Sequence, residues 1–215
     1  HYSEISHKTI IADFETIVAE IRTISDDPVF LFAGTGIGGI IGQCYAATTN
    51  TLTAFAQYGQ VNYREISFFL KTPKPLTCIA YQLINGMAVL FPKMRLNFPL
   101  PKYNGVHAEK ENALYKVFQE KNPEFFRMGI RFVQALFWFM YDKESPLAIL
   151  NDTPTLVIHA KHDRYFPSGY AETYYGALRG KKRIVSIDDC HSSYVFPSDY
   201  IAKKVNEWFR EFSPE

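Results

Sequence analysis

The sequence predicts an α/β fold in which strands and helices alternate around a mainly parallel sheet. Short apolar runs alternate with helical periodicity at both ends of the chain, before residue 58 and after residue 148. The stretch between them is rich in aromatic residues, reads as helical and is broken by prolines. We therefore expect one α/β core, formed by residues 1–57 and 149–215, with a helical cap inserted at 58–148.

The N-terminal part of the core has the pattern of a β-α-β unit. Segment 9–25 places isoleucine, phenylalanine and valine at helical intervals, and Asp26-Asp27-Pro28 ends it. A buried strand is expected at 29–33, a helix of small residues at 38–48 and a second buried strand at 51–56. A right-handed crossover would make these two strands parallel.

In the insertion, the clearest amphipathic helix is expected at 123–141. Strand patterns return at 155–160 and 183–187, and helices are expected at 168–178 and 197–212. Strand–helix alternation thus resumes after the insertion and completes the α/β core.

Composition disfavours several classes of protein. A net charge of +1 and a pI near 7.9 give no sign of a nucleic-acid partner. Three scattered cysteines without a C-x-x-C pair argue against a disulfide framework or zinc and favour a reducing, cytoplasmic location. The first residues lack the apolar core of a signal peptide, and the uncharged run 75–92 is too short and polar for a membrane span. We expect neither a metal nor an organic cofactor.

A glycine cluster after the first strand, Gly34-Thr35-Gly36-Ile37-Gly38-Gly39, fits two motifs. As G-x-G-x-x-G it would be a dinucleotide-binding turn, whose glycines let the backbone approach a pyrophosphate at a helix N-terminus. That motif requires a carboxylate about 20 residues later to bind the ribose hydroxyls. No Asp or Glu occurs between Asp27 and Glu65, which disfavours the dinucleotide interpretation.

As G-x-nucleophile-x-G, the same cluster would be a sharp strand-to-helix turn whose central residue has a positive φ. Gly36 is then the centre, the small residues Gly34 and Gly38 keep strand and helix from colliding, and Gly39 further eases the start of the helix. Far along the chain, Asp163 follows one strand pattern and His191 follows the last one. Nucleophile position, acid and histidine in this order match a catalytic triad, in which the aspartate orients the imidazole and the imidazole acts as general base.

Each of these residues also has an ordinary structural interpretation. Asp163 could cap the helix expected near 168, and His191 could be a surface-loop histidine. His159, in the middle of a strand, is expected to be a core residue with satisfied hydrogen bonds, and His162 a neighbour without chemistry.

Three segments resemble the α/β-hydrolase superfamily, and most of all its lipase and serine-aminopeptidase-like branch. FAGTGIGG is similar to the LVGHSMGG-type elbow, TPTLVIHAKHDRYFP to the strand and acid segment, and DDCHSSYVFPSDYIAKKVNEWF to the histidine loop and last helix. The insertion stands where the family carries its cap. The resemblance implies ester or lipid-type acyl hydrolysis. It places Gly36 at the nucleophile position, Asp163 and His191 at the acid and base positions, and the backbone N–H of Ile37 in the oxyanion hole.

Two departures from the family pattern matter. Gly36 has no nucleophilic atom, and in a serine protease losing the nucleophile costs roughly 10⁶ in kcat. The side chain of Thr35 should point away and Cys44 should pack in the core, so the remaining option is a water activated by the histidine. In addition, 28 residues precede Val29, where the family carries several strands. We therefore expect an N-terminal segment or a partner chain to complete the sheet.

Three functions remain open. The protein is a hydrolase of small hydrophobic or acyl-ester ligands that is impaired at Gly36, a non-catalytic pseudoenzyme that binds a hydrophobic ligand or partner, or a dinucleotide-binding protein. The aromatic cap further suggests peripheral contact with a membrane or lipid.

Overall fold

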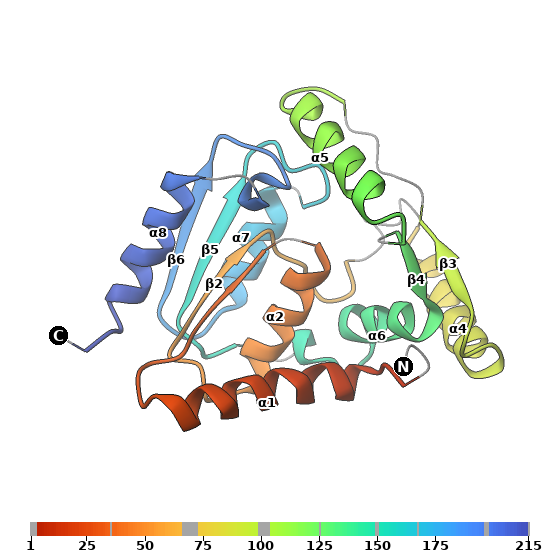
Figure 1. Ribbon diagram of the computed structural model, residues 1–215, viewed down its shortest axis with the longest axis horizontal. Coiled ribbons are helices and arrows are strands. Elements are labelled where there is room, and N and C mark those ends of the chain that lie inside the picture. The colour runs from red at the N-terminus through yellow and green to blue at the C-terminus, as the bar shows by residue number, and fades with distance from the viewer. Residues whose placement is uncertain are drawn as a thin grey trace.

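Four parallel strands form the central sheet, in the order β1-β2-β5-β6 (Figure 1). The computed structural model describes residues 4–34, 36–65, 73–98, 104–124, 126–148, 151–166, 168–195 and 198–214. The strands are β1 (Phe30–Ala33), β2 (Ala54–Tyr58), β5 (Thr155–Ala160) and β6 (Lys182–Ile187). Every residue of β2 and β5 is buried, as expected of inner parallel strands covered on both faces. The predicted mainly parallel sheet is therefore confirmed.

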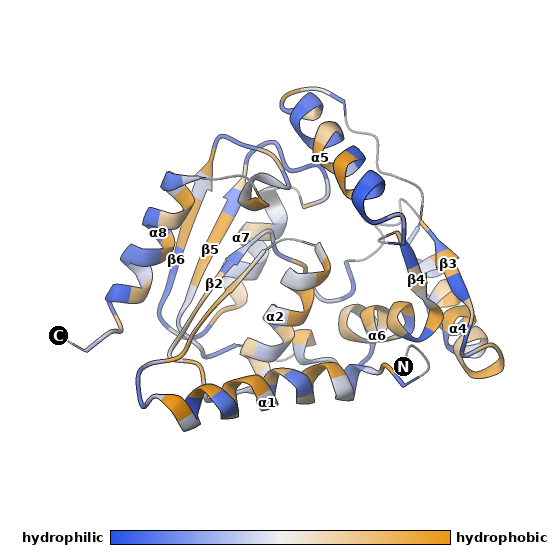
Figure 2. Ribbon diagram, in the orientation of Figure 1, coloured by the Kyte–Doolittle hydropathy of each residue, from blue (hydrophilic) through white to orange (hydrophobic). Residues whose placement is uncertain are grey.

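Helices cover both faces of this sheet. Because side chains alternate along a strand, Leu156 and Ile158 of β5 pack against Trp208 of α8 (Asp199–Arg210). Val157 points the other way, towards α7 (Ser168–Ala177). The Trp208 indole is fully buried, and its Nε1–H donates to the Phe55 carbonyl at 3.0 Å. In Figure 2, α8 is hydrophilic on the side turned away from the sheet.

Helix α1 (His7–Ile24) precedes the sheet and begins with a capping box between Ser6 and Thr9. Its buried face packs on α2 (Gly36–Thr48), where Phe14 contacts Tyr45 at 5.1 Å between ring centroids. A second row of α1 isoleucines, at 17, 21 and 24, is exposed, and β1 is an edge strand whose described neighbour is β2. The completion of the sheet by further polypeptide stays a prediction. The outer edge of β1 is where such a segment would pair.

The insertion is not wholly helical, which corrects the prediction. It contains α4 (Lys74–Leu90), α5 (Ala108–Lys121), α6 (Ile130–Tyr141), the short helix η1 (Pro146–Ala148), and two strands, β3 (Arg95–Asn97) and β4 (Arg127–Gly129), which pair antiparallel. The helix expected at 123–141 begins only at Ile130, because residues 127–129 pair with β3 instead. Figure 1 shows α4, β3, β4 and α6 beyond α2 as seen from the sheet. The sheet itself extends to Tyr58, one residue past the expected boundary.

The apolar residues of the insertion are only partly buried. Within α6, Val133, Phe137 and Met140 lie in the core between α2 and α4. Helix α4, in contrast, exposes Leu76, Ile79, Leu83 and Leu90 by 50 to 72%. Among the described helices, none has both the length and the apolarity to cross a membrane.

Candidate active site

The glycine cluster forms a sharp turn from β1 into α2. Gly36 is the first residue of α2 and has φ of +68°, the positive value predicted for the centre of the turn. Glycine adopts this conformation without strain, whereas another residue would store about 1–3 kcal/mol there. Apart from its chain neighbours and its own helix backbone, no described atom lies within 4 Å of a Cβ placed at Gly36, so a side chain has room there among the described residues. Thr35 lies outside the described residues.

Ile37 is the second residue of α2, so its N–H lies in the first helical turn, where backbone donors have no intrahelical acceptor. The positive end of the helix dipole also lies there and favours a negative charge. This placement is compatible with the role in the oxyanion hole that the family resemblance implies.

The tightest approach of strand and helix occurs at Gly39, not at Gly38 as expected. A Cβ on Gly38 would meet no atom of the described residues within 4 Å, its own helix backbone and chain neighbours aside. A Cβ on Gly39 would overlap the carbonyl oxygen of Gly34, a backbone atom that cannot rotate away. The spacing rule of the elbow therefore applies one residue later in this chain.

We accordingly expect Gly39→Ala to lower the free energy of unfolding by about 1–3 kcal/mol, the usual cost of overpacking. Gly38→Ala should leave stability unchanged or raise it by up to about 1 kcal/mol, because alanine is the better helix former. Urea denaturation of the two variants and the wild type measures the difference. Equal effects at both positions would show that the Gly34 carbonyl does not limit the packing.

Asp163 and His191 contact each other at the same edge of the sheet as the turn. Asp163 follows β5, His191 follows β6 and Gly36 follows β1, and the carboxyl ends of parallel strands share one edge. The distance between His191 Nδ1 and Asp163 Oδ2 is 2.9 Å, and the two side chains are only 5% and 1% exposed. Because a carboxylate only accepts, Nδ1–H donates, and a neutral ring in this orientation has its lone pair on Nε2.

The Asp163 carboxylate is also held from the other side. Its Oδ1 accepts the backbone N–H groups of Tyr165 and Phe166, at 2.8 and 2.9 Å. The rings of these two residues flank the imidazole, with centroids 4.7 and 5.2 Å from that of His191. Asp163 therefore binds its own loop rather than capping the helix at 168, and His191 is a buried, oriented histidine rather than a surface one.

Sequence reasoning missed the residues that hold the loop of His191. The hydroxyl of Tyr58, the last residue of β2, donates to the Cys190 carbonyl. Burial raises the pKa of Tyr58 well above its usual value, so the hydroxyl stays a donor. Burial also raises the pKa of the Cys190 thiol to about 11, which leaves it unsuited as a nucleophile. The position of Tyr58 at a strand end was the available signal.

The other histidine predictions had mixed outcomes. His159 is buried, as expected, but neither ring nitrogen has a hydrogen-bond partner among the described residues, so the expected satisfied hydrogen bonds are not found there. Burial lowers its pKa and favours the neutral form. His162 pairs with Asp188 at 2.8 Å, apart from the His191–Asp163 pair. Cys44 is fully buried, as expected.

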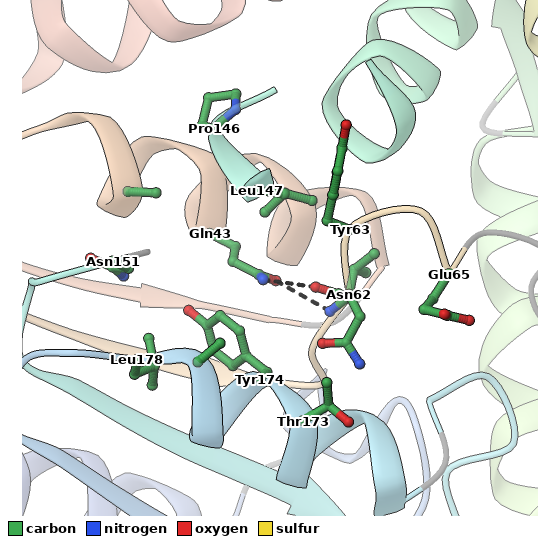
Figure 3. Close-up of a pocket in the computed structure, with 13 residues that line it drawn as sticks. Gln43, Asn62, Tyr63, Glu65, Pro146, Leu147, Asn151, Thr173, Tyr174 and Leu178 are labelled. Carbon is green, nitrogen blue, oxygen red and sulfur yellow. Dashed lines mark hydrogen bonds between the residues drawn. The ribbon is translucent and has the colours of Figure 1, made fainter. Parts of the chain in front are cut away.

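A pocket of about 250 Å³ lies between α2 and α7, and Figure 3 shows Gln43 and Tyr174 on opposite sides of it. Gln43 is fixed there by two hydrogen bonds to the backbone of Val61. None of Gly36, Asp163 and His191 lines this pocket. Within the described part of the chain, no group of three or more acidic, histidine or cysteine side chains could hold a metal ion.

Comparison with known proteins identifies the fold. No family model matches the sequence, and no curated protein matches it. Among solved structures, a monoacylglycerol lipase of Paleococcus ferrophilus is similar, with a TM-score of 0.68 and 17% identity over 97% of this chain and 77% of the other. A soluble variant of the Saccharomyces cerevisiae monoglyceride lipase gives a TM-score of 0.65 and 16% identity, over 97% and 69% of the two chains. A thermophilic esterase of Thermogutta terrifontis gives 0.61 and 14%, over 98% and 74%.

These similarities, together with the parallel sheet and its strand order, define the fold. The chain has the α/β-hydrolase fold, of the kind found in lipases and esterases.

Proposed function

We propose that this chain carries the site of a carboxylic-ester or lipid-type acyl hydrolase whose nucleophile is absent. The observation that supports this most is the buried His191–Asp163 hydrogen bond, at the sheet edge where Gly36 occupies a turn with positive φ. A loop histidine without a catalytic role does not require an aspartate partner, and here that aspartate is itself held by two backbone N–H groups.

Each residue has a role in this proposal. His191 Nε2 takes a proton from the attacking oxygen, and Asp163 stabilises the imidazolium that results. The N–H of Ile37 donates to the oxygen that becomes negative. In a serine enzyme the attacking oxygen belongs to the side chain of residue 36. With glycine there, the pair can activate only a water molecule, so we expect little ester hydrolysis by the wild type.

Covalent labelling with a fluorophosphonate tests the proposal, because this reagent phosphonylates an activated serine with loss of fluoride. We expect no adduct at residue 36 in the wild type and a stoichiometric adduct at that residue in Gly36→Ser, located by peptide mass spectrometry. Gly36→Ser His191→Ala should be labelled far more slowly, because the hydroxyl then lacks its base. A folded Gly36→Ser protein that resists labelling would refute the assignment.

A second candidate is non-catalytic binding of a hydrophobic ligand, and the pocket between α2 and α7 favours it. None of Gly36, Asp163 and His191 lines the pocket, whose lining combines apolar side chains such as Leu147 and Leu178 with polar ones such as Gln43 and Asn62. An environment-sensitive fluorescent fatty acid tests it. Its binding should weaken in Leu178→Arg and stay unchanged in His191→Ala, and the reverse pattern would place the ligand at the triad.

We also propose lipid contact through α4. The exposed leucines and isoleucine of this helix lie in a segment, 75–92, without a charged residue, and Lys93 follows it. Cosedimentation with vesicles that contain anionic lipid should decrease in Leu83→Glu but not in Ile17→Glu, a similarly exposed position on α1. An equal decrease in both variants would contradict a specific role of α4.

Two minor proposals complete the picture. The three cysteines are free, which supports a reducing compartment such as the cytoplasm. Dinucleotide binding is the weakest alternative, because the end of β2 carries Gln57, whose amide already bonds Gly39, Gln43 and Gly59. Quenching of the intrinsic fluorescence by NADH would support dinucleotide binding.

A further inference from the structure

Helix α5, which belongs to the insertion, contacts the loop that carries His191 at three points. Glu111 Oε1 accepts the backbone N–H of Ser192 at 2.9 Å. Lys110 pairs with Asp189 at 3.4 Å, and the Ser192 hydroxyl lies 3.5 Å from that of Tyr115. The insertion therefore contacts the loop directly on both sides of His191.

The contact of Glu111 differs from the other two because the side chain is buried. Glu111 is 2% exposed, although the other acidic residues of the same helix, Glu109 and Glu120, are exposed. Burying a carboxylate is costly unless it is hydrogen-bonded, and a bond from a backbone N–H to a charged acceptor is among the stronger ones. The described ion pairs of α5 involve Lys110 and Lys116 instead. The bond to Ser192 is thus the described interaction that offsets the burial of Glu111.

This bond fixes the backbone next to the imidazole. Ser192 directly follows His191, so an anchored Ser192 N–H sets the orientation of the peptide group between them. On the other side, the Tyr58 hydroxyl anchors the carbonyl of Cys190. His191 is consequently held between one anchor from β2, in the sheet, and one from α5, in the insertion.

We propose that Glu111 is a positioning residue for His191. It acts through the backbone N–H of Ser192 and keeps the imidazole within hydrogen-bond distance of Asp163, so that docking of α5 and formation of the His191–Asp163 pair are coupled. The inference rests on the proposed function only for its effect on rates. Its effect on the geometry of His191 holds for the chain with Gly36 as well.

Proton NMR of the wild-type chain with ¹⁵N-labelled histidine rings tests the geometry without any activity. The His191 Nδ1–H that bonds Asp163 should give a low-field signal, assigned by its loss in His191→Gln. We expect Glu111→Leu to broaden or shift this signal, and Glu111→Gln to retain it, because the amide oxygen still accepts from Ser192. Glu109→Leu, on the exposed side of α5, is the matched control and should change nothing.

If Glu111→Leu lacks a cooperative unfolding transition, Glu111→Asp replaces it, because it keeps the charge and shortens the reach by one methylene. An unchanged His191 signal in the folded variant overturns the proposal, and so does a wild type without that signal.

Activity in the Gly36→Ser background is the second readout. There we expect Glu111→Leu to lower kcat by about 10-fold or more with KM within about twofold, as a misplaced catalytic group does. Glu111→Gln should restore most of the rate. An inert Gly36→Ser protein whose His191 signal still responds to Glu111→Leu would refute the proposed function and support the positioning role. An active Gly36→Ser protein whose kcat is unchanged by Glu111→Leu would support the proposed function and refute the positioning role.

Discussion

Gly36→Ser is expected to hydrolyse a short-chain chromogenic ester about 10³-fold faster than the wild type. Removing the nucleophile of a serine protease costs roughly 10⁶ in kcat. Restoring a hydroxyl should regain less, because the proposed oxyanion hole has one assigned donor among the described residues, Ile37 N–H, and a missing donor costs about 10²–10³. The new side chain has room among the described residues, since none of their atoms beyond the neighbouring backbone lies within 4 Å of a Cβ at residue 36.

The gain in rate should be accompanied by a loss of stability. Residue 36 has φ of +68°, so serine there stores strain of about 1–3 kcal/mol, which urea denaturation would detect. Gly36→Ala carries the same strain without the hydroxyl and should stay inactive. Gly38→Ser places a hydroxyl two residues further, also in open space, and should stay inactive too. Equal activity in Gly36→Ser and Gly38→Ser would mean that the elbow geometry is irrelevant.

The turn at Gly36 and the pair Asp163–His191 were predictable because each is signalled locally. An apolar run marks a strand, and the polar residue just past its end must lie at the carboxyl edge of the sheet. Three such strand ends carry Gly36, Asp163 and His191 in the order of a triad. They therefore predict a site at one edge of the sheet, independently of the structure of the insertion. The contact between residues 163 and 191 then follows from the adjacency of β5 and β6.

Other features depend on contacts that leave no periodic signal. The strands β3 and β4 are three residues each and pair across the whole of α5, so the segment 127–129 looked like the start of a helix. Glu111 lies in a charged helix that reads as solvent-exposed, and its partner is 81 residues away. The close contact between Gly39 and the Gly34 carbonyl was not predicted, because it depends on the angle between β1 and α2. The spacing of glycines does not specify that angle.

The second large effect is expected for Asp163→Asn in the Gly36→Ser background, where kcat should decrease by about 10⁴, as when the triad aspartate of a serine protease becomes asparagine. The hydrogen bonds of Asp163 explain why an isosteric change is so severe. Oδ1 accepts two backbone N–H groups, so the carbonyl oxygen of an asparagine must occupy that position. Its NH₂ group then faces His191 Nδ1 in place of Oδ2.

That NH₂ group can only donate, so Nδ1 must become the acceptor and the ring proton moves to Nε2. An Nε2 that carries a proton cannot accept one from the serine hydroxyl, and general-base catalysis is lost although every atom keeps its place. Asp188→Asn makes the same change at the other His–Asp pair, His162–Asp188, and should leave kcat unaltered. Ester hydrolysis and thermal unfolding of the two variants measure this contrast. If Asp163→Asn and Asp188→Asn had equal rates, the proton transfer would have to be assigned to a group other than His191.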